Sequence, residues 1–134
     1  MTLKFPFGVS QIPGLGQTST VYTLFEVQAA NGVLPFFFLF DTGADLTSLP
    51  VSSAIKLGID LDKCPEGTMT SYDGTVMKVY KSSINILINK KNFIVPCVFN
   101  PNEEVPIVLG RAGILDKFTI VLDGKNKQII FREI

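Results

Sequence analysis

The 134-residue sequence contains no histidine and only two cysteines, Cys64 and Cys97. Without histidine, the chain cannot form Ser-His or Cys-His nucleophile pairs, nor the common histidine-containing zinc sites. The two cysteines lack metal-ligand spacing, so we interpret them as free thiols without a catalytic role. Carboxylates are the best remaining groups for hydrolytic chemistry, and we expect neither a metal nor another cofactor.

The sequence also lacks any segment that concentrates charge of one sign. Its 12 basic and 12 acidic residues cancel, which argues against a nucleic-acid or lipid-headgroup surface. No apolar run is long enough to span a membrane, and residues 1–10 lack the features of a signal peptide. We therefore expect a cytosolic protein, or a soluble domain excised from a larger one, that binds neither nucleic acid nor membrane.

Strand-favouring segments separated by turn residues run through most of the chain. They predict a hairpin over residues 20–40, a protruding hairpin over 67–80, paired strands over 83–99, a short buried strand at 107–109 and a final hairpin over 119–132. Apolar residues recur at helical spacing only over residues 111–118, which predicts one short helix there. A second short helix is expected at residues 52–58, capped by Ser52 or Ser53. We expect one mainly β domain, residues 1–134, with a closed barrel or sandwich-like sheet.

One acidic residue stands out because of its position. Asp41 follows the apolar run of residues 35–40, which reads as a buried strand that ends at the acid. Thr42 offers a small hydroxyl, and Gly43 lets backbone amides approach the carboxylate closely. Hydrolysis by acid and base catalysis needs two groups in opposite protonation states, yet the chain holds no second Asp-Thr-Gly or Asp-Ser-Gly. The missing carboxylate must come from elsewhere.

Two motifs give the chain a family resemblance. Residues 41–45 (Asp-Thr-Gly-Ala-Asp) and 107–113 (Ile-Val-Leu-Gly-Arg-Ala-Gly) flank a hairpin with a glycine at its tip, and in this order they resemble the retropepsins. These are the single-domain aspartic proteases of retroviruses and their cellular relatives. The resemblance covers about residues 20–132 and implies an all-β, closed acid-protease-type barrel with a flap hairpin, one short helix at 111–118 and a C-terminal hairpin.

The resemblance also implies roles for the acid turn, which we define as residues 41–45. Asp41 would be the catalytic acid, paired with its counterpart in a homodimer, and the pair would activate water to hydrolyse a peptide bond. Thr42 would bond across the dimer axis, Gly43 would bind substrate through its carbonyl, and Ala44 would support the turn. Asp45 would contact substrate and form a bidentate ion pair with Arg111.

The hairpin tip resembles the family's flap, which covers a bound polypeptide. Tyr72, Asp73 and Gly74 would then contact substrate, although a glycine-containing tip is equally expected of an ordinary hairpin turn. The tip differs from the glycine-rich viral pattern. The complete C-terminal hairpin also differs from the single terminal strand of viral members and is closer to cellular and bacterial relatives, so the dimer contact is expected to be built differently.

The sequence leaves two other functional readings open. A catalytically silent module on the same fold could dimerise and hold peptides without cutting them. The Asp-Thr-Gly sequence could also be a chance turn in a structural β domain, where Asp is common. The second reading leaves the Leu-Gly-Arg segment and the flap-like hairpin unexplained, and an aspartic endopeptidase is the leading hypothesis.

Overall fold

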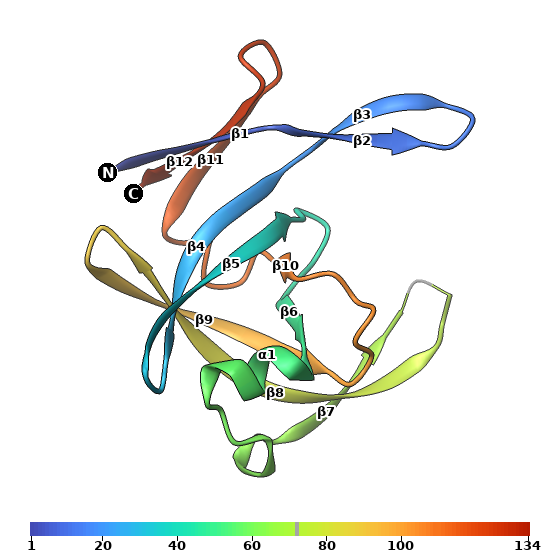
Figure 1. Cartoon of the computed structure of the whole chain (residues 1–134), viewed down its shortest axis with the longest axis vertical. Coiled ribbons are helices and arrows are strands. Elements are labelled where there is room, and N and C mark those ends of the chain that lie inside the picture. The colour runs from blue at the N-terminus through green and yellow to red at the C-terminus, as the bar shows by residue number, and fades with distance from the viewer. Residues whose placement is uncertain (72) are drawn as a thin grey trace.

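The computed structural model describes residues 1–71 and 73–134 (Figure 1). Its elements follow the order β1 (Thr2–Pro6), β2 (Gly8–Ile12), β3 (Gly16–Thr20), β4 (Tyr22–Ala29), β5 (Gly32–Phe40), β6 (Thr47–Pro50), α1 (Val51–Leu57), the 3-10 helix η1 (Leu61–Lys63), β7 (Glu66–Thr70), β8 (Val76–Ile88), β9 (Lys91–Asn100), β10 (Val108–Leu109), β11 (Phe118–Asp123) and β12 (Gln128–Glu133). No helix in the described part of the chain is long and apolar enough to cross a membrane.

The main sheet closes on itself. Its seven strands run in the order β4-β5-β10-β6-β9-β8-β7, and β4 also pairs with β8. That extra pairing joins Val27 to Ile86 and Glu26 to Leu87, at the end of the long strand β8. The predicted all-β closed barrel is therefore confirmed, and β7 with the first part of β8 forms a hairpin that projects from it (Figure 1).

Alternation along the strands explains where the core lies. In β5, Phe36, Phe38 and Phe40 are buried while Phe37 between them is 64% exposed, because successive side chains of a strand point to opposite faces. Phe131 of β12 packs edge-to-face against the rings of Phe5, Phe25, Phe40 and Phe118. This aromatic cluster joins the barrel to the smaller sheet β1-β12-β11, in which the two ends of the chain lie side by side (Figure 1).

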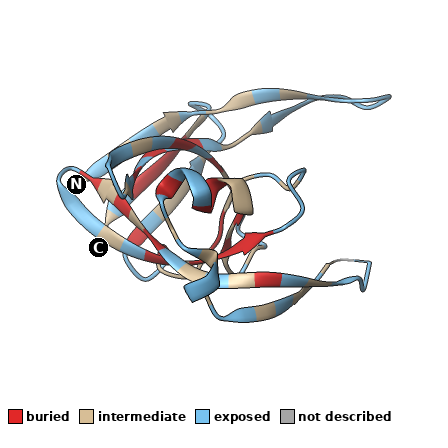
Figure 2. Cartoon of the chain, turned by 60° about the horizontal axis from the view of Figure 1, so that its bottom comes forward, coloured by how far each residue is buried: buried red, intermediate tan, exposed pale blue. Residues whose placement is uncertain are grey.

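The sequence did not predict the N-terminal strands. β1 pairs with β12 along its whole length. β2 and β3 form a separate two-stranded sheet that extends away from the barrel on the same side as the β7–β8 hairpin (Figure 1). Figure 2 shows the hairpin of β2 and β3 mostly in the pale blue of exposed residues, in contrast to the red interior of the barrel.

The predicted helix at residues 111–118 was wrong. Residues 112–117 form consecutive turns, with amide bonds from Leu115 to the Arg111 carbonyl and from Phe118 to the Ile114 carbonyl. Gly113 has a φ of 77°, a left-handed conformation that interrupts a regular helix. The other predicted helix, at 52–58, is confirmed as α1, and it ends at Gly58 in the left-handed region.

Candidate active site

Asp41 directly follows strand β5. The expectation of a buried strand was wrong, because β5 is buried on one face only and Phe37 on its other face is exposed. Backbone bonds hold the end of β5 on both sides: the Phe40 amide donates to the Val21 carbonyl at 2.9 Å, and the Asp41 amide donates to the Leu109 carbonyl at 3.1 Å. Leu109 belongs to β10, which runs parallel to β5. The backbone on both sides of the acid is thus fixed by strands of the barrel, as precise placement of a catalytic group requires.

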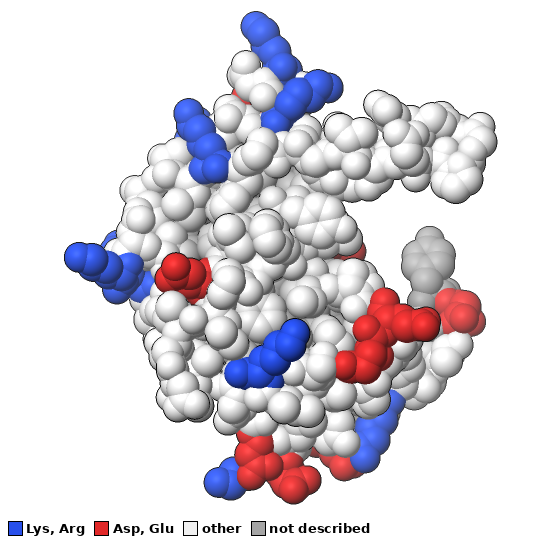
Figure 3. Space-filling model, in the orientation of Figure 1, with Lys and Arg blue, Asp and Glu red and all other residues white. Residues whose placement is uncertain are grey.

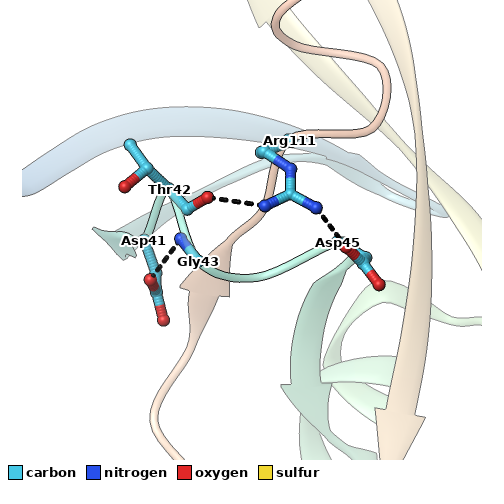
Figure 4. Close-up of polar contacts among 5 residues, drawn as sticks. All are labelled: Asp41, Thr42, Gly43, Asp45 and Arg111. Atoms are coloured by element: carbon cyan, nitrogen blue, oxygen red, sulfur yellow. Dashed lines mark hydrogen bonds and ion pairs between the residues drawn. The ribbon is translucent and has the colours of Figure 1, made fainter.

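The acid turn holds the carboxylate of Asp41 from one side only. The Gly43 amide donates to Asp41 Oδ1 at 2.8 Å (Figure 4). The Ala44 amide donates to the Asp41 carbonyl at 3.2 Å. A Cβ at residue 43 would lie 3.2 Å from that carboxylate oxygen, so glycine allows the close approach. Asp41, Thr42 and Gly43 are exposed. The turn therefore orients the acid while leaving it open to solvent.

The residues just after β10 support the turn from below. The Gly110 amide donates to the hydroxyl of Thr47 at 3.1 Å, inside the protein. A Cβ on Gly110 would lie only 2.4 Å from the carbonyl carbon of Leu46. Only glycine fits at this position without moving the backbone. Sequence reasoning found the Leu-Gly-Arg segment by its resemblance but missed Thr47, because a buried threonine has no distinguishing signal in the sequence.

Arg111 joins the two ends of the acid turn. Its Nη1 donates to the Thr42 carbonyl at 2.8 Å, and its Nη2 forms an ion pair with Asp45 (Figure 4). The predicted Asp45–Arg111 pair is present, but the expected bidentate geometry was wrong, because the planar guanidinium divides its donors between a carbonyl and one carboxylate oxygen. Backbone bonds from Arg111 to Ala44 and from Ala112 to Asp45, both of 3.0 Å, reinforce the same junction.

The flap hairpin, residues 66–80, ends in a turn that Asp73 holds together. One carboxylate oxygen of Asp73 accepts bonds from the Ser71 hydroxyl and from the Thr75 amide. These bonds lower the pKa of Asp73 to about 2. Gly74 adopts a φ of 87°, which favours glycine. The Asp73 carboxylate is thus engaged within its own turn. Tyr72, predicted to contact substrate, lies outside the described residues.

The structure brings most of the predicted site residues together. Residues 41–45 and Arg111 form one junction, and the flap hairpin rises on the same side of the barrel (Figure 1). Among the described residues, no hydrogen bond joins Asp41 to a second acidic side chain. Within residues 1–71 and 73–134, no group of three or more potential metal ligands lies together. One chain thus presents a single carboxylate, that of Asp41, in a turn held by hydrogen bonds.

Cys97 lies beside Thr47 in the sheet, but it is not suited to act as a nucleophile. Cys97 is buried in β9, and its burial, together with the nearby Cys64, raises the pKa of the Cys97 thiol to about 12. A thiol that stays protonated is a poor nucleophile. This supports the interpretation of Cys97 as a core residue.

Comparison with known proteins decides the family. Residues 27–113, which include the acid turn, the flap hairpin and Arg111, match the family model described as "gag-polyprotein putative aspartyl protease". The chain belongs to this aspartyl protease family. The expectation of a retropepsin-like aspartic protease is thereby confirmed, and the enzyme class is aspartic protease.

One solved structure similar to this aspartyl protease is the crystal structure of a retropepsin-like aspartic protease from Rickettsia conorii. The two share 20% sequence identity over 97% of this chain and 98% of that one, with a TM-score of 0.63. At this identity the likeness shows the fold alone. No curated protein sequence matches the chain.

Proposed function

We propose that the active unit is a homodimer in which the Asp41 side chains of two copies form one catalytic pair that cleaves polypeptides. The observation that carries this proposal is the state of Asp41 in one chain. The acid lies exposed in a rigid turn, and among the described residues only the Gly43 amide bonds to its carboxylate. Such a half site is complete when a second copy supplies the same turn.

The chemistry of the pair follows from its electrostatics. Two carboxylates a few ångströms apart cannot both be ionised at low cost, so the pair shares one proton. The ionised member accepts a proton from a bound water, and the protonated member donates to the oxygen of the peptide carbonyl. Water adds to the carbonyl carbon to give a tetrahedral diol. The carboxyl group that took the proton from water then donates it to the peptide nitrogen, the other carboxylate takes a proton back from a diol hydroxyl, and the C–N bond breaks to release an amine and a carboxylic acid. No covalent intermediate with the enzyme is required.

The other residues of the site would bind and align the substrate. The Gly43 carbonyl and the flap tip, residues 72–74, would bond an extended peptide as an added strand. Asp45 would contact residues of the substrate that lie away from the cleaved bond. Thr42 would form a hydrogen bond across the dimer axis. Arg111 supports this arrangement, because its bonds to Thr42 and Asp45 keep the turn in one shape.

Incubation with unfolded casein tests this function. We expect fragments from the parent protein and none from Asp41→Asn, which keeps the size of the side chain but cannot act as a base. Cleavage that persists in Asp41→Asn would exclude the acid as the catalyst. If neither protein cuts but both bind an unfolded peptide, the chain is instead the silent binding module.

A further inference from the structure

The hairpin of β2 and β3 packs on very little of the rest of the protein, which is unusual in a folded domain. We call residues 8–20 the arm. Residues 11–19 are all exposed, and Leu15 in the turn at its tip is 83% exposed. Two strands without a third strand or a covering element are marginally stable in water. In the part of the chain that the structure describes, the arm therefore lacks the packing that a stable hairpin needs.

The edges of the arm are unprotected. Among the described residues, β2 and β3 pair only with each other, so each keeps an outer edge of unpaired backbone groups. Natural proteins usually blunt such edges with charged side chains, but Glu26 is the only charged residue between Lys4 and Asp41. In Figure 3 the arm shows neither blue nor red atoms, and the surface is hollowed below it. An uncharged open edge is suited to pairing with another protein surface.

A complementary surface lies at the base of the arm. A groove of about 480 Å³ is lined there by Phe5, Pro6, Phe7, Gly8, Tyr22, Leu24 and Phe37. Leu24 and Phe37 are cross-strand partners on the outer face of the barrel, and they are 45% and 64% exposed. Aromatic side chains without charge are typical of the buried centre of a protein interface.

The position of the arm indicates its occupant. Val21, the residue after the arm, accepts the bond from Phe40 that fixes the start of the acid turn. The arm thus begins beside the acid turn, where in the proposed dimer the second copy brings its own Asp41. Within the described residues, β2 and β3 each keep one unpaired edge there, whereas the terminal strand β12 is paired on both sides.

We propose that the arm is a dimerisation arm that lies against a second copy of this chain and places Leu15 in that copy's apolar groove. This inference rests on the proposed function, because it names how the partner that supplies the second Asp41 is held. Each five-residue strand spans about 17 Å. Two arms that lie side by side in opposite directions would bring each tip to the base of the other.

The arm and its surroundings offer as many surface residues as a specific interface uses. The arm, the groove and the acid turn together supply about two dozen surface residues, within the range of about 20–30 per partner seen in specific interfaces. The contact is also isologous, since every copy carries both the arm and the groove.

Sedimentation velocity with two matched variants tests the arm. Leu15→Glu places a charge at the tip, and Ile55→Glu places the same charge on an equally open site, since Ile55 of α1 is 72% exposed. We expect Leu15→Glu to raise the dimer dissociation constant at least tenfold while Ile55→Glu leaves it unchanged. Thermal melts confirm that both variants fold. Peptide cleavage per subunit should fall for Leu15→Glu at low protein concentration and recover at high concentration.

The outcomes separate the arm from the catalytic proposal. A Leu15→Glu protein that remains as dimeric as the parent, or that shows only a raised KM, would overturn the arm and leave the Asp41 pair intact. Equal weakening by both variants would also overturn the arm. A parent that is active as a strict monomer would overturn both proposals. Repeating the sedimentation with Asp41→Asn measures association without catalysis, and we expect this variant to dimerise.

A photo-crosslinking amino acid at position 15 tests the contact directly. We expect a covalent dimer whose crosslink maps to the groove of a second copy, at Phe5, Phe7, Tyr22 or Phe37. A crosslink confined to the same chain, or one that maps to the flap hairpin, would contradict the placement of the tip.

Discussion

The hydroxyl of Thr47 accepts a hydrogen bond of 3.1 Å from the amide of Gly110, and both residues are buried. This bond joins β6 to the end of β10, directly beneath the acid turn. Because β10 also carries the carbonyl that receives the Asp41 amide, the bond links Asp41 to the interior of the barrel.

Replacing the Thr47 hydroxyl by a methyl group should loosen this link. Thr47→Val keeps the side-chain shape but leaves the Gly110 amide without its partner, which costs about 1–3 kcal/mol for a buried donor. Chemical denaturation measures the free energy of unfolding. Thr47→Ser, which keeps the hydroxyl, is the control and should preserve activity better than Thr47→Val. Equal activity in the two variants would show that this bond does not position the acid.

Gly110 should not tolerate a side chain. Gly110→Ala would force a Cβ against the Leu46 backbone at 2.4 Å, and we expect it to destabilise the fold by about 1–3 kcal/mol and to reduce peptide cleavage. Gly124→Ala is the control, since a Cβ there meets nothing within 4 Å. If the two variants unfold at the same denaturant concentration, the close approach at Gly110 has no energetic consequence.

Arg111→Lys should lower dimer content and activity while hardly changing the free energy of unfolding. The Asp45 side chain is 86% exposed and that of Arg111 is 42% exposed, so loss of this ion pair should change the free energy of unfolding by less than about 1 kcal/mol. A lysine lacks the two separate nitrogens with which Arg111 reaches Thr42 and Asp45, so we expect lower dimer content and lower activity. Lys91→Arg, at the exposed ion pair with Glu133, is the control. Unchanged sedimentation of Arg111→Lys would refute its role.

The flap turn should open only in strong acid. Bonds from Ser71 and Thr75 lower the pKa of Asp73 from 3.8 to about 2. Since the carboxylate form makes these bonds, their contribution is complete above about pH 4 and is lost as the pH falls through about 2. We expect the Thr75 amide resonance to titrate with a midpoint near that lower value, and to lose this titration in Asp73→Asn. A midpoint near the ordinary value of 3.8 would show that the turn does not hold the carboxylate.

Much of the barrel could be predicted from the sequence because its strands are regular. The apolar run of residues 35–40 and the turn signal at residues 29–32 mark the hairpin that leads to Asp41. The motif at 41–45 located the acid turn and, with Arg111, its ion pair. These features are local, so short stretches of sequence carry them.

Features that depend on tertiary contacts could not be predicted. The bond between Thr47 and Gly110 spans 63 residues, and no local pattern marks it. The helix predicted after Arg111 fails because Gly113 takes a left-handed conformation, whereas apolar spacing alone favours a helix. The arm was missed because its strands face solvent on both sides and lack the alternation of a half-buried strand.

The central claim is that each chain brings one Asp41 and borrows the other from a second copy. Mixing parent protein with Asp41→Asn under conditions of subunit exchange tests it most directly. With the parent amount held fixed above the dissociation constant, we expect cleavage to fall to about half when an equal amount of the variant is added, and to about a tenth at ninefold excess, as random pairing of subunits requires. The double variant Asp41→Asn/Ile55→Glu should lower cleavage by the same amount as Asp41→Asn alone. Cleavage that stays constant as Asp41→Asn is added would show that one chain suffices and would contradict the account.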